Sequence, residues 1–315
     1  SSFLPQVADF LGTNKLILEG QNIGFTISED GLFDSVTYIE FVEDRATGSL
    51  SIPRRSSFDG LIIEGNDKVL SKGITVAATD VIIRNVEAGA LNLYEGARSF
   101  DALDSKFASL NTDMPQPLVG NVINFTNVEF TSDSTIDGGL IATNNVEFGG
   151  SLTVNKDATL DGISVATDLT IKGDVELTLT GDVVITGDVN MPDAAGNATL
   201  TALGTLKVNI FDEDQNGSSP TLNLVVGAGV TIEVVSTTAI DITGLVFNGD
   251  ATLIGGAYAV AFDLTGNTLN IEGSVTATSI TAASINGSGA AATLDAVDLQ
   301  GDVTLLGNLV LSGTV

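Results

Sequence analysis

A short unit recurs along the second half of the chain, and it constrains the fold more than any other feature. The unit is Gly, then Asp, Ser or Asn, then two apolar residues separated by one residue of any kind. Gly permits a corner with positive φ, the small polar residue hydrogen-bonds its own turn, and the alternating residues form a short, half-buried strand. The unit begins at Gly150, Gly173, Gly181, Gly187, Gly249, Gly273, Gly301 and Gly307.

Longer segments repeat as well, at variable spacing. The segment 127–130 (Asn-Val-Glu-Phe) recurs almost unchanged at 145–148, the apolar pattern of 152–160 recurs at 169–177, and the pattern of 171–177 returns at 185–191. Units this short cannot bury an apolar face alone, but stacked coils share one core, with parallel strands about 4.8 Å apart. The sequence therefore predicts an all-β parallel β-solenoid (β-helix), with three short strands per elastic coil of roughly 17–20 residues.

The first part of the chain is less regular. The strand-like runs 61–63 and 81–83 are separated by about the length of one predicted coil, which again suits a solenoid. We divide the chain into residues 1–119, the capped and irregular start of the solenoid, and residues 120–315, the regular Gly-Asp-rich solenoid; a separate small β domain is the alternative for residues 1–119. A short N-terminal helix, with Pro5 in its first turn, would cap the first coil through its apolar residues Phe3, Leu4, Val7, Phe10 and Leu11.

The other end of the sequence has no such cap. An open parallel edge invites a further strand, so we expect either that the natural chain continues or that this edge meets a neighbour. Lys207 is the last basic residue, which favours head-to-tail contact with a more basic part of another copy, although basic residues this scarce also cluster by chance. The predicted assembly edge consists of Leu309, Val310, Leu311 and Val315.

Composition excludes several classes of protein. The chain has 40 acidic and 12 basic residues, a net charge of −28, and neither His nor Cys. Catalytic sites built on His or Cys, imidazole or thiolate metal sites and disulfides are therefore excluded, and binding to nucleic acid is disfavoured. No apolar run is long enough to span a membrane. We expect an extracellular or cell-surface protein whose secretion signal has been removed.

One acidic segment matches part of a calcium-binding loop. Asp212, Asp214 and Asn216, followed by Gly217, fit the first half of an EF-hand-type pattern, in which alternate oxygen ligands converge on Ca²⁺. The twelfth position is Asn223, where that pattern requires a bidentate Glu. A Ca²⁺ site and a solvated acidic turn are therefore both open, and Ca²⁺ is the only cofactor that we consider.

Residues 111–113 (Asn-Thr-Asp) resemble one short motif of the polygalacturonases, which are β-helix enzymes that cut polysaccharides. The companion motifs of that family, an Asp-Asp pair, Gly-His-Gly and Arg-Ile-Lys, are missing from this sequence. We therefore predict that the protein is not an enzyme. A polysaccharide hydrolase that uses a pair of carboxylates is the lesser alternative.

The Gly-Asp-Val-x-Leu units at residues 173–177 and 301–305 resemble those of prokaryotic surface β-solenoids, such as adhesin stalks, surface-layer proteins and extracellular filament subunits. This resemblance implies a structural, self-assembling extracellular protein whose partners are copies of itself, with Ca²⁺ as a candidate stabilising ion. The alternative is an adhesin or fibre segment that binds a cell-surface glycan.

Overall fold

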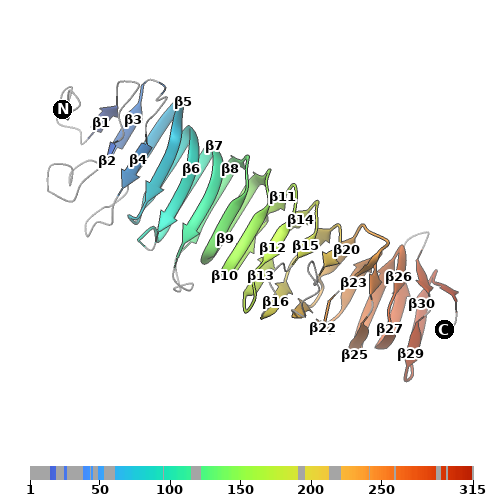
Figure 1. Cartoon of the computed structure of the whole chain (residues 1–315). Coiled ribbons are helices and arrows are strands. Elements are labelled where there is room, and N and C mark those ends of the chain that lie inside the picture. The colour runs from blue at the N-terminus through green and yellow to red at the C-terminus, as the bar shows by residue number, and fades with distance from the viewer. Residues whose placement is uncertain are drawn as a thin grey trace. The chain divides into compact units, whose positions relative to one another are not determined.

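The computed structural model describes residues 15–18, 25–26, 38–42, 44, 49–52, 61–94, 96–114, 122–190, 196–212, 221–240, 242–258, 260–288, 292–295 and 297–313. It confirms the all-β parallel β-solenoid, with about 12 turns, and all the regular elements in this part of the chain are strands (Figure 1). The predicted capping helix lies outside the described residues. Among the residues that are described, the structure has no helix long and apolar enough to cross a membrane.

The chain divides into two compact units, residues 1–149 and 150–315. The boundary predicted between residues 119 and 120 falls within residues 115–121, which lie outside the described part, and it stays a prediction. The strands of the first unit are β1 (Lys15–Leu18), β2 (Phe25–Thr26), β3 (Tyr38–Phe41), β4 (Ser49–Ile52), β5 (Leu61–Val76), β6 (Val81–Tyr94), β7 (Ser99–Asp113), β8 (Val122–Phe130) and β9 (Ser134–Phe148).

The strands of the second unit are mostly shorter than β5–β9 of the first unit. They are β10 (Leu152–Asp161), β11 (Ser164–Val165), β12 (Leu169–Ile171), β13 (Glu176–Thr180), β14 (Val183–Ile185), β15 (Val189–Asn190), β16 (Asn197–Ala202), β17 (Leu206–Val208), β18 (Phe211–Asp212), β19 (Thr221–Val226), β20 (Thr231–Val234), β21 (Ala239–Ile240), β22 (Gly244–Phe247), β23 (Ala251–Ile254), β24 (Ala257–Tyr258), β25 (Ala261–Glu272), β26 (Ser274–Thr276), β27 (Ser279–Gly287), β28 (Thr293–Asp295), β29 (Asp298–Gln300), β30 (Thr304–Gly307) and β31 (Val310–Ser312).

Parallel pairing between successive turns follows the apolar alternation of the sequence. Leu61 pairs with Val81 and Phe130 with Phe148, as the repeats predict. Leu152 pairs with Leu169, whereas Leu206 pairs with the more distant Ile232, so the coils vary in length more than the repeats indicate. Corners and local bulges, such as the register shift between Leu264 and Thr268 of β25, absorb the difference.

Phenylalanine rings fill much of the core of the first unit. Phe130 is fully buried and stacks on Phe148, with ring centroids 4.8 Å apart, and on Phe107 at 5.8 Å. Phe125 meets Phe130 edge-on at 5.2 Å. The parallel register pairs Phe107 with Phe130 and Phe130 with Phe148, so equivalent rings in successive turns align and pack as a column.

Corners in this unit depend on Asn and Asp in the left-handed backbone region. Asn85, Asp104, Asn127 and Asn145 have φ between 47° and 56°, a region that these side chains tolerate better than most. The Asn145 amide donates to Asn127 Oδ1 (2.9 Å), and the Asn127 amide donates to Asp104 Oδ1 (2.8 Å). The corners therefore form a hydrogen-bonded ladder that runs from turn to turn.

In the second unit, the repeated glycines meet two different requirements. Gly181, Gly273, Gly301 and Gly307 take positive φ, as their turns require. Gly187 does not, but a Cβ there would lie 2.2 Å from Asp168 Oδ1, so Gly187 is needed because the neighbouring turn approaches closely.

Candidate functional site

The predicted calcium ligands are only partly described. Asp212 ends β18, where its backbone pairs in register with Asn190 of β15. Asp214 and Asn216 lie outside the described residues, so the calcium loop stays a prediction. Within the part of the chain that the structure describes, no three Asp or Glu side chains come together in a group that could hold a metal ion.

Three Asp residues of the Gly-Asp corners accept hydrogen bonds from the following turn. Asp174 Oδ1 accepts from the backbone N–H of Asn197 (3.1 Å), and Asp250 Oδ1 accepts from that of Thr268 (2.6 Å). Asp188 Oδ1 accepts from the Asn209 side-chain amide (2.7 Å). These carboxylates therefore satisfy backbone and amide donors between turns, which accounts for the Asp in the repeated unit.

The turn formed by β29, β30 and β31 exposes side chains that are buried in the preceding turn. Leu305 pairs in register with Ile285, and Leu311 with Leu294. Ile285 and Leu294 are fully buried, whereas Leu305 is 41 % exposed and Leu311 43 % exposed. Apolar side chains at positions that face the core in the preceding turn are thus exposed to solvent in this turn. We call the surface made by residues 297–313 the terminal turn.

Sequence reasoning named part of this surface. Of the predicted edge residues, Leu309 is half-buried, Val310 and Leu311 are exposed, and Val315 lies outside the described residues. Leu305 was missed, although it is the second apolar residue of the unit that starts at Gly301. That position faces the core in other units, such as Leu177 after Gly173.

In the first unit, a buried carboxylate lies in a polar network. Arg84 Nε donates to Glu64 Oε2 (2.6 Å), the Asn85 amide donates to Glu64 Oε1 (2.9 Å), and the backbone N–H of Asn66 donates to the same oxygen (3.2 Å). Burial raises the pKa of Glu64, but the hydrogen bonds from Asn85, Asn66 and Arg84 outweigh it and lower the pKa below the usual 4.5. Hydrogen bonds to Tyr38 and Glu64 raise the pKa of Arg84 against its partial desolvation. The charges of Glu64 and Arg84 are paired with each other. Because Glu64 lies on β5 and its partners Arg84 and Asn85 lie on β6, the network links two neighbouring turns.

The residues of the polygalacturonase-like motif also bond between turns. The Asn111 amide donates to Asn92 Oδ1 (3.1 Å), and the buried Thr112 hydroxyl accepts from the backbone N–H of Asp137 (2.8 Å). Both side chains are engaged in contacts that tie neighbouring turns together.

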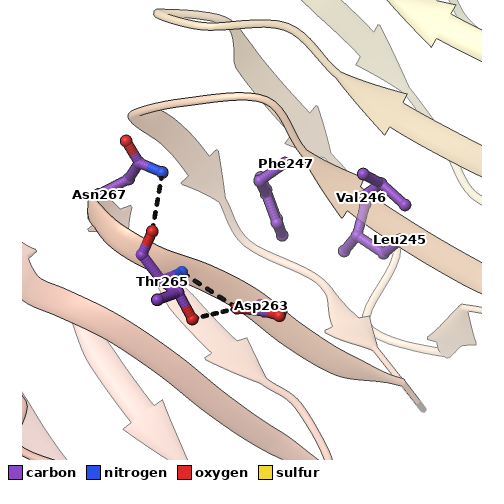
Figure 2. A pocket seen from close by; sticks show the side chains of 6 residues that line it. All are labelled: Leu245, Val246, Phe247, Asp263, Thr265 and Asn267. Carbon is purple, nitrogen blue, oxygen red and sulfur yellow. Dashed lines mark hydrogen bonds between the residues drawn. The ribbon is translucent and has the colours of Figure 1, made fainter.

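A shallow hollow on the second unit was not anticipated from the sequence. It has a volume of about 340 Å³ and lies between β22, which contributes Leu245, Val246 and Phe247, and the segment that contributes Asp263, Thr265 and Asn267 (Figure 2). Strand β25 has the segment 265–267 where its neighbour β27 has only Ala283, and this bulge forms the polar wall. Such a bulge, in which one strand has more residues than its partner between two paired positions, can be recognised in a sequence only when the register of the two strands is known.

The fold thus defines the chain as a parallel β-solenoid with exposed apolar side chains on residues 305–311 and a small, two-sided hollow. Comparison with known proteins finds no matching family model, no matching curated protein and no matching solved structure.

Proposed function

We propose that this protein is a structural, self-assembling subunit of an extracellular filament, appendage, sheath or surface layer. The observation that supports it is the terminal turn. Leu305 and Leu311 are exposed there, whereas the residues that they pair with in the preceding turn, Ile285 and Leu294, are buried. Among the described residues, β29, β30 and β31 pair only with the preceding turn, so a further parallel turn supplied by another copy would cover these side chains and pair with these strands. Edge strands left open in this way are templates for strand addition.

Charge favours contact with a different surface of the next copy. No basic residue follows Lys207, so two terminal turns facing each other would oppose Asp298 and Asp302 to their own equivalents without a compensating charge. A contact between unlike surfaces is heterologous, and heterologous contacts that do not close into a ring propagate into filaments. The net charge of −28 also makes assembly depend on ionic strength or on divalent cations that screen repulsion.

The test compares assembly of the wild-type chain with two variants of the terminal turn, Leu305→Lys and Leu311→Lys. The matched control is Val184→Lys, which introduces the same charge at an exposed, outward-facing position of β14. Sedimentation velocity over a range of protein concentrations, with negative-stain electron microscopy, measures assembly in Ca²⁺ and again after EDTA. Circular dichroism verifies that each variant keeps its β structure.

We expect concentration-dependent polymers of the wild type and of Val184→Lys, and none of the two terminal-turn variants. Polymers that dissolve in EDTA would support calcium bridging, while polymers indifferent to EDTA would keep the assembly proposal and remove calcium from it. Discrete monomers of the wild type under all conditions would overturn the proposal.

A further inference from the structure

The hollow beside β22 joins two surfaces of different character. Val246, which is 52 % exposed, forms the apolar floor, and Leu245 and Phe247 beside it line the hollow but are largely buried, at 7 % exposed each. The opposite wall is the bulge in β25, where Gly266 takes a φ of 80° and lets the chain loop outward. In Figure 2, Asp263, Thr265 and Asn267 form this wall, and the three apolar residues lie across from it. In repeat proteins, such insertions in a regular turn often carry binding residues.

Hydrogen bonds within the wall fix its polar groups but leave capacity for a ligand. Asp263 Oδ1 accepts from the Thr265 backbone N–H (3.0 Å) and hydroxyl (2.6 Å), and its other oxygen, Oδ2, has no partner among the described residues. The Asn267 amide donates one hydrogen to the Thr265 carbonyl (3.3 Å), which leaves its second hydrogen and its own oxygen. The bonds from Thr265 lower the pKa of Asp263, so the acceptor stays ionised at neutral pH.

We propose that this hollow binds a single hexopyranose ring, with the ring's C–H face on Val246 and its hydroxyl groups on Asp263 and Asn267. Sugar hydroxyls both donate and accept, and this wall offers one ionised acceptor and an amide that does both. The volume is near the lower end of the roughly 300–1,000 Å³ of small-molecule sites, so it suits one ring better than a length of polymer.

Other ligand classes fit the hollow less well. An anion would meet the charge of Asp263 with no basic residue after Lys207 to offset it. A divalent cation would need several oxygen ligands, and Asp263 is the only carboxylate among the described residues that line the hollow. An alkylammonium ion would use Asp263 and the apolar floor but not the second hydrogen of the Asn267 amide.

Saturation-transfer NMR tests this proposal, because it detects weak ligands that exchange rapidly. The probes are the methyl glycosides of glucose, galactose and mannose at millimolar concentration, with n-butylammonium as the cationic comparison and a linear trisaccharide as the polymer comparison. The variants are Asp263→Ala and Val246→Asp, and the control is Asp182→Ala, which removes an exposed carboxylate at another corner.

We expect at least one glycoside to receive saturation from the wild type and from Asp182→Ala, and its affinity to fall roughly tenfold or more in Asp263→Ala, since a charge-assisted hydrogen bond is lost. Transfer to one end ring of the trisaccharide would identify a chain end as the natural ligand, and transfer only to the free glycoside would identify a free sugar. Transfer to butylammonium alone, no transfer to any glycoside, or transfer that persists in both hollow variants would overturn the proposal. None of these outcomes depends on whether the protein polymerises.

Discussion

The aromatic column of the first unit gives the largest effect that the structure predicts. Phe130 is fully buried and contacts three rings, those of Phe107, Phe125 and Phe148, at centroid distances of 5.8, 5.2 and 4.8 Å. Truncating a buried Phe to Ala costs about 3–5 kcal/mol. Part of that cost is the loss of ring pairs, each worth about 0.5–1.5 kcal/mol beyond the buried area, and Phe130 makes three of them. We therefore expect Phe130→Ala to lower the free energy of unfolding by about 5 kcal/mol, at the top of the ordinary range.

Phe130→Leu is the matched comparison, because it keeps most of the buried volume and loses only the ring contacts; we expect it to cost about 1–2 kcal/mol. Urea unfolding followed by circular dichroism measures both variants, and amide hydrogen exchange locates the loss. In a solenoid each turn contacts mainly its neighbours, so lost protection should be concentrated in β7, β8 and β9. A loss below about 2 kcal/mol for Phe130→Ala, or equal losses for Ala and Leu, would refute the column as a source of stability.

Three further changes test other buried or stacked groups. Burial raises the pKa of Tyr258, and its hydroxyl has no hydrogen-bonding partner among the described residues, so Tyr258→Phe should stabilise the protein by about 1 kcal/mol in thermal unfolding. The lowered pKa of Glu64 means that its stabilising contribution is complete above the unfolded value near 4.5 and is lost as pH falls through the folded value; Glu64→Gln should therefore lose stability at pH 7 and flatten the acid limb of a pH titration of stability. The Asp104 carboxylate accepts a hydrogen bond from Asn127 but has no hydrogen to donate to the corner of the preceding turn. Asp104→Asn should therefore extend the corner ladder by one hydrogen bond and raise the free energy of unfolding by about 0.5–1 kcal/mol, as measured by urea unfolding.

Much of the fold could be predicted from the sequence, because corner chemistry and apolar alternation are local. The recurrence of segment 127–130 at 145–148 matches the observed register. The recurrence of 152–160 at 169–177 matches in its first half, where Leu152 pairs with Leu169, but Leu160 pairs with Leu179 and not with Leu177. The recurrence of segment 171–177 at 185–191 does not match, since Ile185 pairs with Val165 and not with Ile171. The Gly-Asp-Val unit occurs at several corners of one turn, so comparing units can match different sides of the solenoid.

The two surfaces with a proposed function, the terminal turn and the hollow beside β22, were harder to predict, because each depends on how strands pair between turns. Leu305 has the same local sequence signal as buried residues, and its exposure follows only from its place in the terminal turn. The hollow arises because segment 265–267 opposes a single residue of β27, a mismatch that the sequence of β25 alone does not reveal. The N-terminal cap and most of the calcium loop lie outside the described residues and stay predictions.

The terminal turn raises the question of which interaction would drive its association. Leu305 and Leu311 are each exposed over about two fifths of their surface. Full burial of a Leu is worth about 1.5–3 kcal/mol, so covering the exposed parts of both side chains contributes only about 1.3–2.5 kcal/mol. Backbone groups of β29, β30 and β31 that have no partner among the described residues offer more, at about 0.5–1.5 kcal/mol for each net hydrogen bond.

Leu311 can separate these two contributions. The N–H of Val310 already donates to the Ala292 carbonyl of the preceding turn at 3.0 Å, so the alternation of a strand directs the N–H of Leu311 to the open side. Leu311→Ala removes only the apolar side chain, whereas Leu311→Pro also removes an edge donor without breaking a bond to the preceding turn. If backbone pairing drives assembly, sedimentation should show that Leu311→Ala still polymerises at higher protein concentration while Leu311→Pro does not. Equal loss in both variants would show that side-chain burial dominates and would contradict the strand-addition mechanism.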